Sequence, residues 1–173
     1  MKVALLIPPN NFKDESLSRL KSELDKWGVQ AVVASYSTRS CTGYHGAVVR
    51  PQLNAASINA DEFDGIVLID GPGVDLYKLH DFRPLLDTLM SFSSRKKIIA
   101  AISNSIKVLA RANIIVNIKL AVPRDEETVR LVALYRGLPS GKPIEAETNI
   151  ITVGNPDNIG LLADALLEKL GAK

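Results

Sequence analysis

The stretch "IIAAISNSIKVLA", residues 98–110, decides the fold because it joins three kinds of local structure without a linker. Its first five residues form an unbroken apolar run, which is typical of a strand buried on both faces of a sheet. Three small polar residues follow, and from Ile106 the apolar residues recur at helical spacing. A strand, a tight turn and a helix in this order indicate an α/β fold, in which ligands bind beyond the carboxyl ends of the strands. We therefore expect Ser103, the first residue of the turn, to lie where such folds keep their chemistry.

The same unit recurs along the chain. Further strands are predicted at the apolar runs 3–7, 29–35, 65–69 and 149–153, and a shorter one near 119–122. Helices are predicted at 14–27, around 85–90, from 106, over 125–135, and from a cap at Asn155 to about Leu170. Residues 36–53 are rich in Ser, Thr and Gly and predict a small hairpin. Alternating strands and helices favour a mostly parallel sheet covered on both faces. The sequence thus predicts one α/β domain over residues 1–173, three-layered and doubly wound with a flavodoxin-like sheet.

The bulk composition excludes several classes of protein. The chain is 46% hydrophobic and 23% charged with a formal net charge of +2, which is typical of a globular domain. Its longest basic block, residues 95–97, is too short to predict nucleic-acid binding. The single cysteine cannot form an internal disulfide and fits a reducing compartment. The apolar run at the start is too short for a signal peptide or a membrane span. We expect a soluble cytoplasmic protein without nucleic-acid or membrane partners.

Three loops should converge at the carboxyl edge of the predicted sheet, because parallel strands end on one side. The polar residues expected there are Lys13 in the loop after the first strand, Asp70 and Gly71 after the third, and Ser103, Asn104 and Ser105 after the fourth. These residues are the candidate site.

Six segments spread over nearly the whole chain carry a resemblance to a known family. They are "KVALLI", "ELDKWGVQAVVAS", "TGYHG", "DEFDGIVLIDG", "IIAAISNS" and "ITVGNPDNIGLLADALL". Together they resemble the ThiJ/PfpI superfamily, which has the class I glutamine amidotransferase-like fold. The most specific feature is "DEFDGIVL" followed by a glycine loop, a strand and a strained turn.

The resemblance implies a site that this chain has altered. Active members place a cysteine nucleophile on the strained turn, usually with a histidine after it, and a carboxylate from the first loop bonds the thiol. The cysteine position falls on Ser103 and the histidine position on Asn104. The carboxylate position falls on Lys13, and the first glycine of a pocket-lining pair falls on Asp70. Every one of these positions departs from the family pattern. A slip of the loop alignment would instead place Asp14 or Asn11 at the carboxylate position.

Two functional hypotheses follow. In the first, the chain is a pseudoenzyme without the cysteine-dependent hydrolase or glyoxalase chemistry, and it acts as a stress-related or small-molecule binding protein. Asp70, Gly71, Asn104 and Ser105 would then contact a small anionic or carbonyl ligand. Lys13 would either pair with Asp70 or, together with the amides of the 103–105 turn and the glycine loop, bind the anion itself. In the second, the chain is an intracellular protease or amidase in which Ser103 attacks and Lys13 is the base. A charged Asp70 close by would hold Lys13 protonated, which favours the first hypothesis.

The remaining candidates predict no cofactor. Cys41 and His45 are too few to form a zinc site, and no other metal site is predicted. Residues 71–73, "GPG", lack the lysine of a phosphate-binding loop. We expect Cys41 to be an inert thiol and His45 a hydrogen-bonded structural histidine. The resemblance further implies a homo-oligomer, either a dimer or a hexamer.

Overall fold

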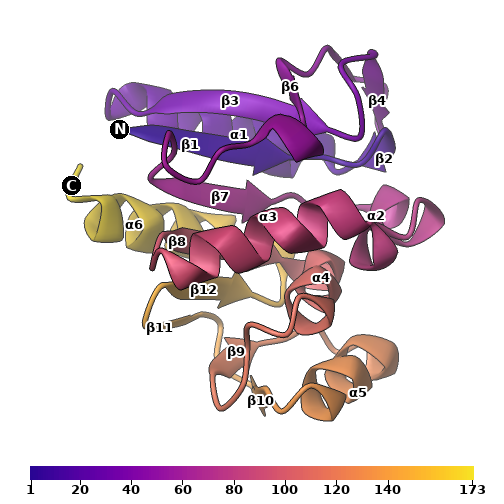
Figure 1. Cartoon of the computed structure of the whole chain (residues 1–173), viewed down its shortest axis with the longest axis vertical. Helices are drawn as coiled ribbons and strands as arrows, with labels where there is room; N and C mark the ends of the chain where they lie inside the picture. The colour runs from indigo at the N-terminus through magenta and orange to yellow at the C-terminus, as the bar shows by residue number, and fades with distance from the viewer.

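The computed structural model describes the whole chain, Met1–Lys173, and places a seven-stranded sheet between two layers of helices (Figure 1). The strand order is β11-β12-β8-β7-β1-β3-β6. The parallel strands are β1 (Lys2–Leu6), β3 (Gln30–Ser35), β6 (Leu53–Asn54), β7 (Gly65–Leu68), β8 (Ile98–Ile102) and β12 (Ile150–Val153). Only the edge strand β11 (Glu145–Glu147) is antiparallel. The predicted doubly wound α/β fold is confirmed.

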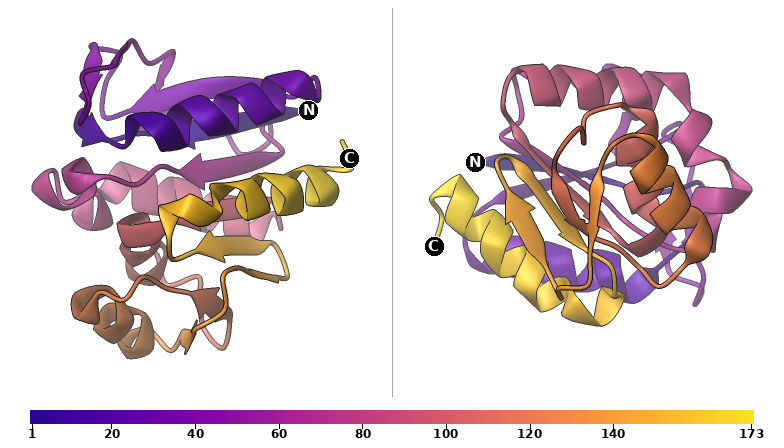
Figure 2. Two further views of the ribbon diagram at one scale, coloured as in Figure 1. Left: turned by 180° about the vertical axis from the view of Figure 1, so that it is seen from behind. Right: turned by 90° about the horizontal axis from the view of Figure 1, so that it is seen from below.

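The helices divide between the two faces of the sheet. Figure 2 shows α1 (Asp14–Lys26) and α6 (Ile159–Leu170) side by side on one face, and α3 (Arg83–Ser94) lies on the other with α4 (Ile106–Arg111). Each face has its own hydrophobic core, because successive strand residues point to opposite sides. In β1, Leu5 packs in the core under α1 and α6, whereas Leu6 packs in the core under α3. This double burial explains why the strands are continuous apolar runs.

Several short elements were not predicted. The segment after Gly71, expected to be a loop, begins α2 (Pro72–Leu76), because proline suits the first turn of a helix. The expected hairpin is present as β4 (Cys41–Gly43) and β5 (Val48–Val49), and β2 (Asn10–Phe12) joins it to form a second sheet. A third small sheet pairs β9 (Lys119–Ala121), the short strand predicted near 119–122, with the unpredicted β10 (Leu138–Ser140). These two strands flank α5 (Glu126–Leu134), the helix predicted over 125–135.

The four remaining helical elements are single 3₁₀ turns. They are η1 (Ala55–Ser57), η2 (Leu79–Asp81), η3 (Ser103–Ser105) and η4 (Pro156–Asn158). One of these turns, η4, lies between Asn155 and the last α-helix. The Asn155 side chain accepts a hydrogen bond from the backbone N–H of Asp157 and so caps η4, and α6 begins only at Ile159. The prediction that Asn155 caps the last α-helix directly was therefore wrong.

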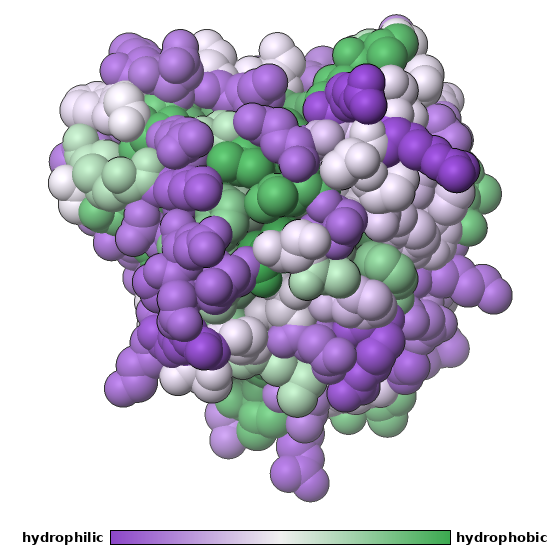
Figure 3. All heavy atoms as spheres, turned by 45° about the horizontal axis from the view of Figure 1, so that its top comes forward, coloured by the Kyte–Doolittle hydropathy of each residue, from purple (hydrophilic) through white to green (hydrophobic).

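The surface mixes polar and apolar side chains. Figure 3 shows hydrophobic atoms that form a patch between hydrophilic groups on one face of the molecule. None of the helices combines the length and the apolar character needed to cross a bilayer. The carboxyl ends of the parallel strands lie at one edge of the sheet, and both chain termini lie at the opposite edge (Figure 1). That carboxyl edge holds the candidate site.

Candidate functional site at the carboxyl edge of the sheet

Ser103 occupies a strained turn directly after β8. Its φ is +52°, in the left-handed region that residues with a side chain rarely adopt. Ser105 stabilises this turn, since its hydroxyl oxygen accepts a hydrogen bond from Ile102 N at 2.9 Å. The same hydroxyl lies 2.9 Å from the carbonyl oxygen of Leu68, on the neighbouring strand β7. Ser105 is fully buried, so its hydroxyl holds the turn in place from beneath.

Asn104 ties this turn to the loop after β7. Its Nδ2 donates to the carbonyl oxygen of Gly71 at 2.8 Å, and its Oδ1 accepts from Gly71 N at 3.3 Å. The same Nδ2 also donates to Asp75 Oδ2 at 3.2 Å. The oxygen and the nitrogen of the Asn104 amide, next to Ser103, are thus both hydrogen-bonded, and they connect the turn to the β7 loop.

The loops after β1 and β7 meet through their backbones. Lys13 N donates to the carbonyl oxygen of Asp70 at 2.8 Å. Gly71 has φ +134°, and a Cβ there would lie 2.4 Å from the carbonyl oxygen of Asn11. Because β1, β7 and β8 are neighbours, the predicted convergence of the three loops is present.

The Lys13 side chain, by contrast, makes no ion pair with Asp70 and no hydrogen bond with Ser103. It lines a pocket of about 390 Å³ between the start of α1 and the start of α6, together with Glu15, Arg19, His45 and Asp157. No ion pair within 4.0 Å links Lys13 to Asp70, so the expected pair between them is not formed. Nor does any hydrogen bond join Lys13 to Ser103. Lys13 therefore contacts the β7 loop through its backbone and lines the pocket at the starts of α1 and α6.

Asp14 and Asn11, the alternatives for the first-loop position, have other contacts. The Asp14 carboxylate accepts hydrogen bonds from the backbone N–H groups of His45 and Ala47, each at 2.8 Å. Desolvation acts to raise its pKa, but these bonds outweigh it, so the pKa of Asp14 lies below its usual value. A Cβ on Gly43 would come within 2.3 Å of this carboxylate. Asp14 therefore holds the β4–β5 turn against the start of α1. The backbone carbonyl of Asn11 packs closely against Gly71.

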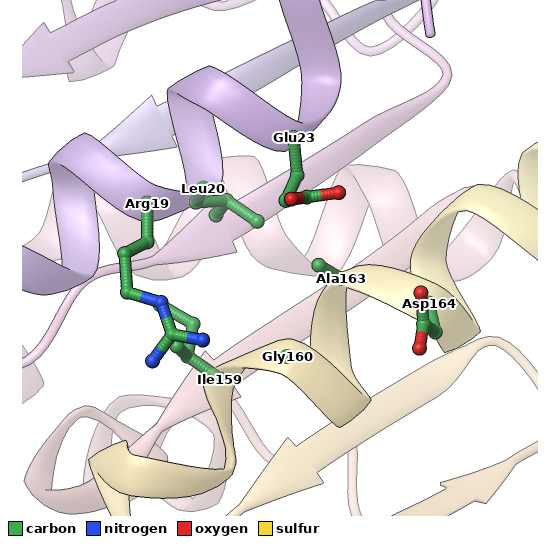
Figure 4. Close-up of a pocket in the computed structure, with 7 residues that line it drawn as sticks. All are labelled: Arg19, Leu20, Glu23, Ile159, Gly160, Ala163 and Asp164. Atoms are coloured by element: carbon green, nitrogen blue, oxygen red, sulfur yellow. The ribbon is translucent and has the colours of Figure 1, made fainter. Parts of the chain in front are cut away.

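His45 and Glu15 are exposed neighbours of Lys13 in the same pocket. His45 Nδ1 lies 2.7 Å from Glu15 Oε1, which confirms the expected hydrogen-bonded histidine. No group of three or more His, Cys, Asp or Glu side chains is placed to hold a metal ion. A smaller pocket of about 170 Å³ lies farther along α1 and α6, where Figure 4 shows Arg19 and Glu23 across from Gly160 and Asp164.

Asp70 is buried behind the loops. The residue is only 3% exposed, and its Oδ1 atom has no hydrogen-bond partner. Burial raises the pKa of Asp70, and the Ser16 hydroxyl and the charge of Lys13 act in the opposite direction without cancelling the effect. Asp70 is therefore a desolvated carboxyl without an ion-pair partner.

We expect Asp70→Asn to stabilise the protein in a pH-dependent way. The folded-state pKa of Asp70 lies above its unfolded value of 3.8, so its favourable contribution is complete below 3.8 and is lost as the pH rises through the folded pKa. The difference in Tm between Asp70→Asn and the wild type should therefore grow from pH 4 to pH 8. Thermal unfolding followed by circular dichroism measures it. Asp157→Asn, at an exposed position, is the control, and a Tm difference for Asp70→Asn that stays constant with pH would contradict the assignment.

Lys107 was missed by the sequence reasoning. Its side chain is only 1% exposed, and its ammonium group pairs with Asp75 and lies 3.7 Å from Glu127. Since Asp75 also accepts from Asn104, a polar chain links the Ser103 turn through α2 to α5. The available signal was a lysine within the apolar run Ile106–Ala110.

Cys41 is buried in the core under α1, at 2% exposure. Burial raises its pKa, and the Ser35 hydroxyl only partly offsets this, so the neutral thiol predominates at neutral pH. We expect Ellman's reagent to modify Cys41 slowly in the native protein at pH 8 and rapidly in urea. Equal rates in the two conditions would show that the thiol is accessible and ionised.

Comparison with known proteins agrees with this architecture. The model of the DJ-1/PfpI family matches residues 1–169. An uncharacterized protein of Methanocaldococcus jannaschii is 25% identical over 98% of this chain and 82% of its own length. A deglycase of Pyrococcus horikoshii is 28% identical over 66% of this chain and 68% of its own length.

Solved structures show the same fold. A ThiJ/PfpI domain protein from Brachyspira murdochii superposes with a TM-score of 0.92 at 22% identity, covering 99% of this chain and 97% of that one. Drosophila melanogaster DJ-1beta superposes with a TM-score of 0.83 at 22% identity, covering 99% and 91%. With its family model matched over almost the entire length and its strained turn in place after β8, the chain belongs to the DJ-1/PfpI family.

Proposed function

We propose that this chain is a DJ-1/PfpI protein that binds a small anionic or carbonyl compound at the carboxyl edge and does not carry out cysteine-dependent chemistry. The observation that carries the proposal is the side chain of Asn104. It stands where the resemblance places a histidine, and its amide is bonded to Gly71 and Asp75. An amide in that position cannot accept the proton of Ser103.

The serine itself needs such an acceptor. A cysteine becomes a thiolate when its pKa is modestly lowered, whereas a serine hydroxyl reacts only with an adjacent base. Lys13 is the candidate base for this role, and it lines the pocket at the starts of α1 and α6 with no hydrogen bond to Ser103. The relatives named deglycases make deglycase activity the first enzymatic function to test.

The ligand site that we propose includes Lys13 and the polar wall of its pocket. Lys13, Arg19 and His45 supply positive charge or hydrogen-bond donors there, and of the two carboxylates in the same wall, Glu15 is bonded to His45 and Asp157 faces solvent. A small carboxylate with a carbonyl group, such as glyoxylate, fits both that chemistry and a volume of about 390 Å³. In this proposal Gly71, Asn104 and Ser105 position the loops next to the ligand, and Asp70 lies buried behind them.

Binding tests this proposal directly. We expect glyoxylate to raise the Tm of the wild type, and Lys13→Gln to remove that shift, as measured by thermal shift and calorimetry. Lys21→Gln, on the exposed part of the same helix, is the matched control. No shift with glyoxylate, or an unchanged shift in Lys13→Gln, would overturn the assignment.

Covalent labelling tests the alternative. We expect no labelling of Ser103 by a serine-directed fluorophosphonate between pH 6 and 10, and no deglycase activity. Labelling in the wild type that disappears in Lys13→Ala would instead establish the serine–lysine hydrolase and refute a purely binding role.

We also propose that the chain acts in the cytoplasm as a homo-oligomer. The family resemblance supports this assembly. Size-exclusion chromatography with light scattering measures it, and a purely monomeric mass at micromolar concentration would refute it.

A further inference from the structure

A second pocket lies farther along the carboxyl edge, beyond the residues discussed above. Its volume is about 590 Å³, and three loops form its walls. They are residues 122–124 after β9, residues 141–143 after β10, and Gly154, Asn155, Pro156 and Asn158 after β12. None of the residues that line it is acidic, whereas Arg124 and Lys142 bring two cations to it.

Close backbone contacts set the spacing of the walls. A Cβ on Gly154 would lie 2.2 Å from the carbonyl oxygen of Val122, so only glycine allows the two loops this close. Beneath them, Ala121 N donates to Thr152 Oγ1 at 2.8 Å in the buried core. The pocket therefore has its shape before any ligand enters.

Nearby carboxylates do not neutralise Arg124. Asp125 caps α5, accepting from Thr128 Oγ1 at 2.5 Å and from Glu127 N at 3.2 Å. Glu126 pairs with Arg130 at 3.0 Å. The exposed guanidinium of Arg124 has no ion-pair partner of its own, although acidic residues follow it directly in sequence.

Lys142 and the asparagines complete the lining. The Lys142 side chain is 72% exposed, and its ammonium lies 3.9 Å from Glu145, a long ion pair that leaves its other hydrogen-bond donors for a ligand. Asn155 and Asn158 line the opposite wall, and the side chain of Asn158 caps no backbone N–H of α6. A planar guanidinium, an ammonium and side-chain amides are the donors that suit an oxyanion.

We propose that this pocket binds a small oxyanion, a phosphate or carboxylate group, between Arg124 and Lys142. The site shares only Pro156 with the pocket of Lys13 and uses different charged residues. It therefore stands or falls independently of the function proposed above.

Calorimetry with inorganic phosphate and with malonate, at constant ionic strength set by chloride, tests the site. We expect millimolar or tighter binding of at least one anion, and a loss of about tenfold or more in Arg124→Gln and in Lys142→Gln. Phosphate alone, malonate alone or both would each support the site and identify the group that it prefers. Binding of neither at millimolar concentration would overturn it.

Two controls keep this result interpretable. Arg130→Gln removes a charge from the same segment at a residue already paired with Glu126, and it should leave the affinity unchanged. An equal loss in Arg130→Gln would show general charge attraction and overturn the site. Lys13→Gln should also leave the affinity unchanged, so failure of the glyoxylate site and failure of this one are distinguishable.

Discussion

Gly71→Ala is expected to lower the free energy of unfolding by about 4 kcal/mol, from backbone strain and overpacking together. The φ of +134° at Gly71 is a conformation that alanine scarcely adopts. The added Cβ would also lie 2.4 Å from Asn11 O and 2.8 Å from Lys13 N, and backbone atoms cannot rotate away as a side chain can. Urea unfolding followed by fluorescence or circular dichroism measures the change.

Gly46→Ala separates the two causes. Gly46 also has a positive φ, of +91°, but nothing lies within 4 Å of a Cβ built there. We expect it to cost about 1–2 kcal/mol, the contribution of strain alone. If Gly71→Ala and Gly46→Ala cost the same, the close approach of the two loops has no energetic weight.

Asp75→Ala is expected to lower the free energy of unfolding by about 3 kcal/mol, because it leaves a buried ammonium without its nearer partner. The Lys107 side chain is 1% exposed, and after the change only Glu127, at 3.7 Å and itself 73% exposed, would face it. Asn104 would also lose an acceptor at 3.2 Å. The cost therefore falls on α2 and α4 and on the Ser103 turn together.

The double variant Asp75→Ala/Lys107→Met is the matched control. Methionine keeps most of the buried volume and removes the charge, so the double variant should recover much of the lost stability. Urea midpoints for the wild type, both single variants and the double variant complete the cycle. A double variant as unstable as Asp75→Ala would show that lost packing, not the unpaired charge, causes the effect.

The central sheet could be predicted because its physics is simple. A strand covered on both faces must be apolar throughout, and residues 98–102 satisfy this as clearly as residues 65–68. The short elements carry no such pattern. α2 contains Pro72 and Gly73, and β10 and β11 are three-residue strands without an apolar run, whose pairing depends on other segments.

The candidate site was predictable in its backbone and not in its side chains. Strand order alone brings the loops of Lys13, Gly71 and Ser103 to one edge. The pocket that Lys13 lines is formed with residues of α1, the β4–β5 turn and the start of α6, and no local pattern encodes that combination. For the same reason the burial of Lys107 could not be foreseen, since its partners come from α2 and α5.

The backbone contacts at Gly71 and Gly154 affect which substitutions this edge can accept during evolution. Main-chain atoms set the spacing of the loops, so the side chains at positions 13, 103 and 124 carry little of the architecture. Substitutions there can exchange one chemistry for another while the framework that presents them persists. Such a separation makes the edge evolvable: a lineage can abandon an inherited reaction and acquire a new ligand without passing through an unfolded intermediate.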